Sequence, residues 1–115
     1  MSFNAVTREI GDVTVIDLDG RIALRDGCAS LYDIIKENLN AGRKQILINM
    51  AGIGYIDSTG LGVLVSGYRL VKSQGGELKL VNLTKKVSDL LQITKLHAVF
   101  DIHTDETQAL ASFRS

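Results

Sequence analysis

Short stretches of alternating or continuous hydrophobic residues predict five β-strands along the chain. The first two stretches are separated only by Gly11 and Asp12, a typical pair for a tight turn, so they predict an antiparallel hairpin. The third stretch is continuously apolar and too short for a helix, which favours a strand that is buried on both faces. The five expected strands are residues 3–10, 13–18, 46–50, 78–81 and 98–102.

Between and after the strands, apolar residues recur every three or four positions, which predicts helices. Gly42 and the pair Gly75-Gly76 stand where two of these helices should end, and Asp105 with Gln108 resembles a capping box at the start of the last helix. The element order ββαβαβαβα predicts one α/β domain over residues 1–115, a mixed β-sheet with packed α-helices and a right-handed parallel crossover. The expected helices are residues 26–41, 58–73, 84–92 and 105–113.

Composition narrows the choice of partner. The chain has 115 residues, 45% of them hydrophobic, with 13 basic and 13 acidic side chains. This balance gives no reason to expect nucleic acid or an anionic membrane as partner, and it leaves a protein or a small ligand. The single cysteine, Cys28, fits a reducing compartment, and neither a signal peptide nor an apolar membrane span is visible. We therefore expect a cytoplasmic protein that is a monomer or weak dimer.

The helix expected at residues 58–73 has two different sides. Val63 and Leu70 are apolar although they fall on the predicted solvent side, and Gly62, Ser66 and Gly67 are small enough to let another helix approach. Two interpretations remain open: another element of this chain covers that side, or it is a surface for a partner. The predicted inner stripe is Leu61, Leu64, Val65, Tyr68 and Val71, and the predicted outer side is Thr59, Val63, Ser66, Gly67 and Leu70.

Ser58 stands where this helix is expected to begin, directly after Asp57. Serine is a common N-cap, and this is the simplest interpretation of the residue. The same position has free backbone N–H groups that can bind phosphate oxygens, so Ser58 is also a candidate site of phosphorylation. A phosphate adds a charge of about −2. Because the Asp57 carboxylate would repel that charge, we expect its main effect on a partner contact rather than on the fold.

Motifs for catalysis, cofactors and metals are missing. A nucleophile elbow would need glycine where Ile56 stands, and no lysine follows Gly60 at the position that a phosphate-binding P-loop requires. His97 and His103 both fall near the last expected strand and are typical of surface or strand histidines. No His, Cys and carboxylate cluster has metal-ligand spacing. We expect no catalytic residue, no cofactor and no metal.

The run from Ile56 to Gly62, Ile-Asp-Ser-Thr-Gly-Leu-Gly, resembles the phosphoacceptor motif of anti-sigma-factor antagonists of the STAS family. The similarity extends to Leu-Asp-Gly at residues 18–20, to Gly-Gly-Glu-Leu at 75–78 and to residues 96–100, so it covers nearly the whole chain. One departure is the run Gly-Arg-Ile-Ala at residues 20–23, where many antagonists carry one or two acidic residues.

The resemblance implies a STAS domain without catalytic activity that works in a cycle of partners. The unphosphorylated protein captures an anti-sigma serine kinase and frees a sigma factor, the kinase phosphorylates the serine that matches Ser58, and a PPM-type serine phosphatase resets the cycle. Alternatives are a STAS interaction module of another system, such as a stressosome, a regulator of a non-sigma output or a lipid-transport accessory subunit, and, less favoured, a small enzyme. The expected partner-binding residues are Asp57, Thr59, Gly60, Gly62, Val63, Ser66 and Leu70.

Overall fold

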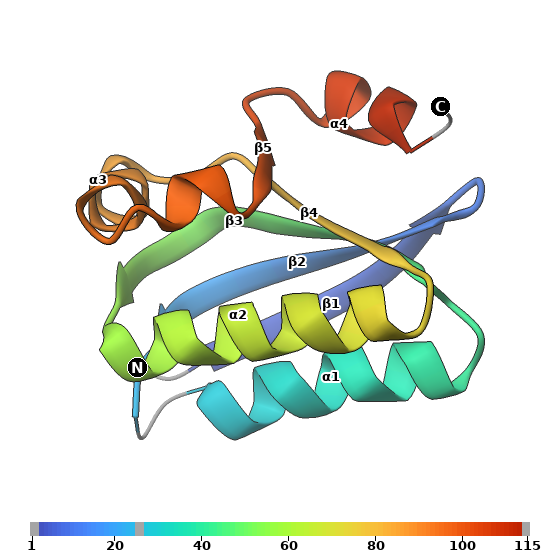
Figure 1. The fold of residues 1–115 in the computed structure, drawn as a ribbon, viewed down its shortest axis with the longest axis horizontal. Coiled ribbons are helices and arrows are strands. Elements are labelled where there is room, and N and C mark those ends of the chain that lie inside the picture. Colours follow the sequence, from blue (N-terminus) through green and yellow to red (C-terminus); the bar gives the residue numbers. More distant parts are fainter. Residues whose placement is uncertain (1–2, 25–26, 114–115) are drawn as a thin grey trace.

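The computed structural model describes residues 3–24 and 27–113, which form a five-stranded mixed sheet with helices on both faces (Figure 1). The strand order is β1-β2-β3-β4-β5, with β1 antiparallel to β2 and the other pairs parallel, as the element order predicts. The strands are β1 Phe3–Ile10, β2 Val13–Ile22, β3 Gln45–Ile56, β4 Glu77–Val81 and β5 Asp101–His103. The helices are α1 Cys28–Asn40, α2 Ser58–Ser73, α3 Lys85–Ile93 and α4 Glu106–Ser112, with a short 3₁₀ turn, η1, at Leu96–Ala98.

Helices α1 and α2 lie side by side along one face of the sheet (Figure 1). Their inward residues and the sheet form the main core, in which Ile35, Ile48 and Leu64 are fully buried. The bounds of α2 are those expected from the sequence, and Leu61, Leu64 and Val71 of its inner stripe are buried as predicted. The start of α1 expected at residue 26 lies outside the described residues, and the described helix begins at Cys28.

Strand β3 is much longer than the expected residues 46–50, because it continues through Gly52 and Gly54 as far as Ile56. The register between β2 and β3 shifts between Asp17 and Asp19 and again between Gly20 and Arg21, so the strand pairing is irregular here. A Cβ at Gly52 would stand 2.6 Å from the Leu18 carbonyl oxygen, so only glycine allows the two strands to approach here. The extension matters because it carries the strand up to the first turn of α2.

The last strand was expected at 98–102 and lies instead at Asp101–His103. Residues 96–98 form the 3₁₀ turn, which follows Lys95 in the left-handed conformation at φ 63°. Phe100 is buried and its ring packs edge-on against Tyr68 of α2, with the ring centroids 5.4 Å apart. The apolar run that suggested a strand is thus used to pack a turn onto the core.

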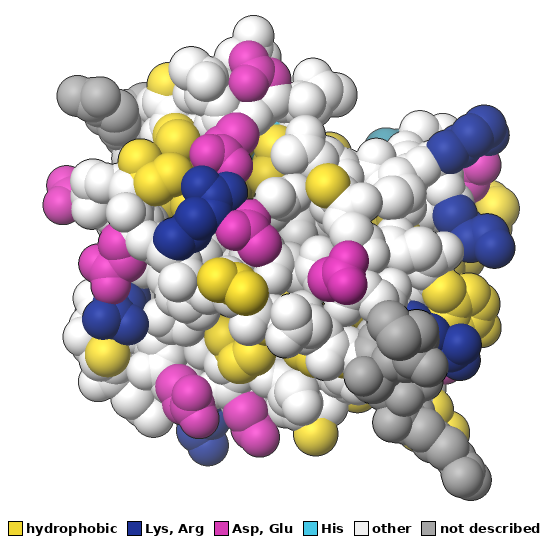
Figure 2. Space-filling view, turned by 180° about the vertical axis from the view of Figure 1, so that it is seen from behind, with side chains coloured by type: hydrophobic (Ala, Val, Ile, Leu, Met, Phe, Trp, Pro, Cys, Tyr) yellow, Lys and Arg dark blue, Asp and Glu magenta, His cyan; other side chains and the backbone are white. Residues whose placement is uncertain are grey.

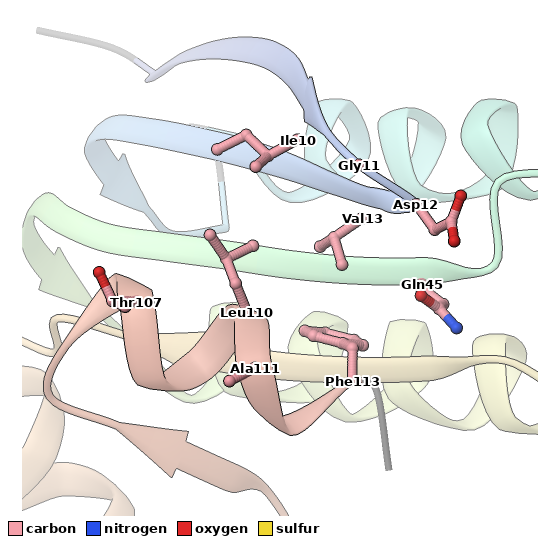
Figure 3. Close-up of a pocket in the computed structure, with 9 residues that line it drawn as sticks. All are labelled: Ile10, Gly11, Asp12, Val13, Gln45, Thr107, Leu110, Ala111 and Phe113. Atoms are coloured by element: carbon pink, nitrogen blue, oxygen red, sulfur yellow. The ribbon is translucent and has the colours of Figure 1, made fainter.

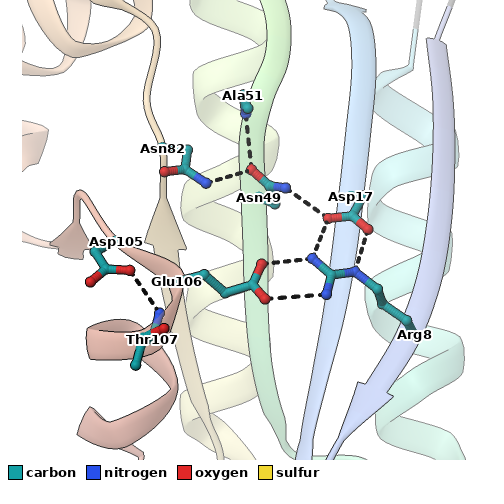
Figure 4. Close-up of polar contacts among 8 residues, drawn as sticks. All are labelled: Arg8, Asp17, Asn49, Ala51, Asn82, Asp105, Glu106 and Thr107. Atoms are coloured by element: carbon teal, nitrogen blue, oxygen red, sulfur yellow. Dashed lines mark hydrogen bonds and ion pairs between the residues drawn. The ribbon is translucent and has the colours of Figure 1, made fainter.

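Helix α4 covers part of the opposite face of the sheet. The Arg8 guanidinium lies between two carboxylates, 2.6 Å from Asp17 and 2.7 Å from Glu106, and so ties α4 to strands β1 and β2 (Figure 4). Asp105 caps α4 by accepting a hydrogen bond from the Thr107 N–H at 3.0 Å. The Gln108 side chain makes no hydrogen bond within the described residues, so Asp105 acts as a simple N-cap and the expected capping box is not formed.

A hollow of about 790 Å³ remains between α4 and the β1–β2 turn, away from α2 (Figure 3). It is bordered by Ile10 and Val13 from the hairpin and by Leu110 and Phe113 from the C-terminal segment. The hollow and α2 are therefore on opposite sides of the sheet, and the residues expected at the functional site do not contribute to it.

Candidate functional site

Strand β3 passes into α2 through one residue, Asp57, which is the N-cap of the helix. Ser58 is therefore the first helical residue, and the expectation that Ser58 is itself the cap is wrong. The reason is local: Asp57 has the extended backbone of a cap at φ −108° and ψ −176°, and its carboxylate reaches the N–H of Gly60 at 2.8 Å. With the cap supplied by Asp57, the Ser58 hydroxyl is not needed to hold the helix.

The Asp57 carboxylate joins two separate segments. One oxygen accepts the hydrogen bond from Gly60, and the other accepts a hydrogen bond from the Leu24 N–H in the β2–α1 loop at 3.1 Å. The hydrogen bond from Gly60 lowers the pKa of Asp57 the most and outweighs the effect of burial, so the group is ionised at neutral pH. The expectation of a free anion site at the helix start is corrected here, because the protein's own carboxylate already uses the Gly60 N–H.

Ser58 itself is exposed, and its hydroxyl makes no hydrogen bond within the part of the chain that the structure describes. Thr59 is also exposed and follows in the first turn. A phosphate on Ser58 would adjoin the fixed negative charge of Asp57, and the two anions would repel each other. The hydroxyl is thus open to modification, and a phosphate there would project into solvent or into a partner.

Fewer residues are exposed on the outer side of α2 than the sequence predicted. Thr59, Gly62 and Ser66 are exposed, together with Arg69, which sequence reasoning did not single out. Val63 and Leu70 are half-buried and pack at the edge of the core.

Gly67 was expected on the outer side of α2 and is in fact buried. A Cβ at this position would lie 2.7 Å from the end of the Ile35 side chain in α1. The first interpretation of the outer side therefore applies in part, because α1 covers one flank of α2. A strip along the helix stays exposed, and its use as a partner surface stays a prediction.

Two glycines in the first turns of α2 have different surroundings. Gly60 is buried, and a Cβ there would collide with the Ile22 carbonyl oxygen and meet Ile56 Cγ1 at 2.8 Å, so glycine is needed for the helix start to pack on β2. Gly62 is exposed, and a Cβ there would have nothing within 4 Å. Glycine inside a helix lowers stability by about 1 kcal/mol relative to alanine. Contacts within the described chain therefore explain why glycine is needed at position 60, whereas they give no reason for glycine at position 62.

The remaining candidate residues are one cysteine and two histidines. Cys28 lies at the start of α1 and donates to the Ala23 carbonyl at 2.9 Å, and burial raises the pKa of its thiol. His97 is exposed in the 3₁₀ turn, and His103 in β5 lies 3.2 Å from the Asp101 carboxylate, as expected of surface and strand histidines. Within residues 3–24 and 27–113, no group of three His, Cys or acidic side chains could hold a metal ion, and no helix has the length and apolarity to cross a membrane.

Sequence reasoning also missed Leu24, whose side chain is 67% exposed in the loop that Asp57 holds against α2. A single leucine in a loop has no periodicity, and its nearness to Ser58 depends on a hydrogen bond between segments 33 positions apart in the chain. Only the unusual run at residues 20–23 pointed to this loop. The site that the structure brings together thus comprises the start of α2, its open strip and residues 23–24 after β2.

Comparison with known proteins places this geometry in a family. The profile of the STAS domain family matches residues 4–109, nearly the whole chain. The chain therefore belongs to the STAS domain family. This assignment confirms the resemblance found in the sequence, and the mixed sheet with its helices confirms the expected fold class.

Individual relatives are antagonists of anti-sigma factors. The chain is 47% identical over 55 residues to the anti-sigma-B factor antagonist of Bacillus subtilis, a match that covers 48% of this chain and about half, 50%, of that relative. The crystal structure of an anti-sigma factor antagonist from Mycobacterium paratuberculosis superposes with a TM-score of 0.88 at 18% identity, covering 99% of this chain and 96% of that one. The Bacillus cell fate determinant SpoIIAA in its phosphorylated form superposes with a TM-score of 0.73 at 18% identity over 95% and 98% of the two chains. The last two similarities concern the fold alone.

Proposed function

We propose that this protein is an anti-sigma factor antagonist that is switched by phosphorylation of Ser58. In this proposal the unphosphorylated form binds an anti-sigma serine kinase and thereby releases a sigma factor. The kinase then phosphorylates Ser58, which ends the complex, and a PPM-type serine phosphatase restores the binding form. The function is binding rather than catalysis.

The observation that carries the proposal is the exposed Ser58 hydroxyl at one end of the open strip of α2. Asp57 provides the cap, so phosphorylation of Ser58 removes no hydrogen bond that the helix needs. The open strip of Thr59, Gly62 and Ser66 continues from Ser58 without a bulky side chain as far as Arg69, which would let a partner helix approach this part of α2 closely. The names of the curated relatives support the same function.

The switch follows from electrostatics at the contact. A phosphate adds a charge of about −2, and it would stand beside the Asp57 carboxylate, which is itself ionised. A partner that buries this corner must remove water from both anions, which opposes binding unless it supplies matching cations. Each 1.4 kcal/mol of opposition weakens binding about tenfold. Modification of one hydroxyl can therefore end a complex without unfolding the domain.

The test begins with the purified protein, ATP and each serine kinase encoded in the same genome, with intact-mass detection and localisation of the phosphate. We expect one phosphate, on Ser58. Ser58→Ala should abolish modification and keep kinase binding. Ser58→Asp should weaken kinase binding by about tenfold, which corresponds to a loss of about 1.4 kcal/mol in binding free energy. Ser73→Ala is the matched control, since Ser73 is also an exposed serine of α2 but lies at the far end of the helix, and it should still be phosphorylated at Ser58.

Phosphate on Thr59 or on any residue other than Ser58 would contradict the assignment of the acceptor. Equal binding of the kinase by the phosphorylated and unphosphorylated forms would contradict the switch. If none of the kinases binds or modifies the protein, the sigma-factor cycle is wrong, and an interaction module of another system becomes the better description.

A further inference from the structure

A second surface lies next to the candidate site, between the end of β3 and helix α3. It is a groove of about 580 Å³ in which Tyr55 and Ile56 face one side of α3. Tyr55 is 42% exposed and Ile93 is 77% exposed, the largest fraction among the exposed large hydrophobic residues of the described chain. The lining residues are Tyr55, Ile56, Lys85, Lys86, Asp89, Leu90 and Ile93.

The apolar and basic residues of α3 form one helical stripe on this side. Lys86, Leu90 and Ile93 follow the i, i+4, i+7 spacing, so they share a face, whereas Val87 and Leu91 point inward and are fully buried. The core already takes the inward face of α3, and no neighbouring segment within residues 3–24 and 27–113 covers Ile93. Ile93 and the neighbouring Tyr55 therefore leave apolar surface beside α3 that a partner could cover.

The groove has more cations than carboxylates, although the whole chain is balanced. The Arg21 guanidinium and the Lys86 ammonium lie 5.4 Å and 6.0 Å from the centre of the Tyr55 ring. Asp89 has the only carboxylate among the lining residues, and it is paired with the Lys85 ammonium at 2.9 Å. Basic side chains stand beside exposed hydrophobic ones at the edge of the molecule where α3 lies, on the right in Figure 2. A ligand that complements these residues is apolar at its centre and carries a negative charge on the side of Lys86.

We propose that the groove between β3 and α3 is a docking site for an acidic, apolar segment of a protein partner. Such a segment would place an apolar side chain between Tyr55 and Ile93 and a carboxylate near Lys86. The polar atoms of the lining side chains belong mainly to two long, exposed lysines, rather than to the converging, fixed groups that orient a small molecule. The inference is independent of the proposed function, because it requires neither Ser58 nor its phosphate.

The test is a ¹⁵N chemical-shift titration of the full chain with two synthetic peptides, acetyl-Asp-Phe-Asp-Leu-Glu-amide and acetyl-Lys-Phe-Lys-Leu-Lys-amide. With the acidic peptide we expect saturable shifts concentrated at residues 55–56 and 85–93. The basic peptide should bind at least about tenfold more weakly, a difference of about 1.4 kcal/mol. Ile93→Ser and Lys86→Glu should each weaken binding of the acidic peptide by about fivefold or more, within the range expected for a contact residue.

Lys36→Glu on α1 is the matched control for the charge change, because Lys36 is also an exposed helical lysine, and it should bind the acidic peptide normally. All three variants should melt like the parent chain, since the replaced side chains are exposed. Equal binding of both peptides, or shifts spread over the whole surface, would overturn the proposal. Shifts at the groove that appear on raising the protein concentration alone would also overturn it, since the occupant would then be a second copy of this chain.

Discussion

Replacing Gly62 with alanine is expected to make the domain more stable and its partner complex weaker. Gly62 lies inside α2, and a Cβ there meets no atom within 4 Å, so the methyl group introduces no strain. Alanine restricts the unfolded chain and favours the helix by about 0.5–1 kcal/mol relative to glycine. For a domain of this size, such a gain raises the melting temperature by about 2–6 °C.

Gly60→Ala is the matched comparison, two positions away in the same helix. Its Cβ would collide with the Ile22 carbonyl oxygen, a backbone atom that cannot rotate away, and would lie 2.8 Å from Ile56 Cγ1. Overpacking of this kind costs about 1–3 kcal/mol, which exceeds the gain in helix propensity. We therefore expect Gly60→Ala to melt earlier than the parent chain, whereas Gly62→Ala melts later.

Thermal melting and urea unfolding measure the stability of both variants, and affinity for the kinase that modifies Ser58 measures binding. If a partner helix approaches the open strip at Gly62, the added methyl should weaken that complex by about tenfold, or 1.4 kcal/mol. A lower melting temperature for Gly62→Ala would refute the reasoning about its empty surroundings. Higher stability with unchanged affinity would show that the partner does not touch this part of α2.

Two further predictions concern the fold. Arg8 lowers the pKa of Asp17 through its hydrogen bonds, so this pair stabilises the fold above the ordinary pKa of aspartate and loses that contribution as the pH falls through the lowered value. Asp17→Asn should therefore lower the free energy of unfolding by about 1–2 kcal/mol near neutral pH. In urea unfolding at a series of pH values, the variant should lose less stability than the parent chain as the pH falls. The same loss of stability in acid for both chains would contradict the role of the Arg8–Asp17 pair. Leu64→Lys places a charge where the side chain is fully buried, so circular dichroism should show an unfolded or early-melting chain; a normal melt would mean that this stripe does not face the core.

Local patterns in the sequence were sufficient for the hairpin and for α2, and insufficient where an element depends on distant pairing. The first strand, the turn and the start of β2 follow from alternation on either side of Gly11, and α2 follows from its apolar spacing. The expected end of β2 at residue 18 was wrong, because the strand continues to Ile22 alongside the extended β3. The extension of β3 through Gly52 could not be predicted, because glycine is a poor strand former and is required there only by the close approach of Leu18 in β2. The predicted position of β5 was wrong for a similar reason, because Phe100 packs against Tyr68 of α2, and local sequence patterns do not reveal a contact between such distant residues.

The glycines of α2 show the same limit at the candidate site itself. Gly60, Gly62 and Gly67 look alike in the sequence, and all three invite the interpretation of a low surface for a partner. In the structure Gly60 lets the helix start pack on the Ile22 backbone, Gly67 makes room for Ile35 of α1, and only Gly62 is open. Since Gly60 and Gly67 are explained by packing within the chain, Gly62 is the one glycine of the three that supports a close-fitting partner. That is why a single methyl group at this position tests the docking surface more directly than a charge at half-buried positions on the same helix, where unfolding and loss of binding would be confounded.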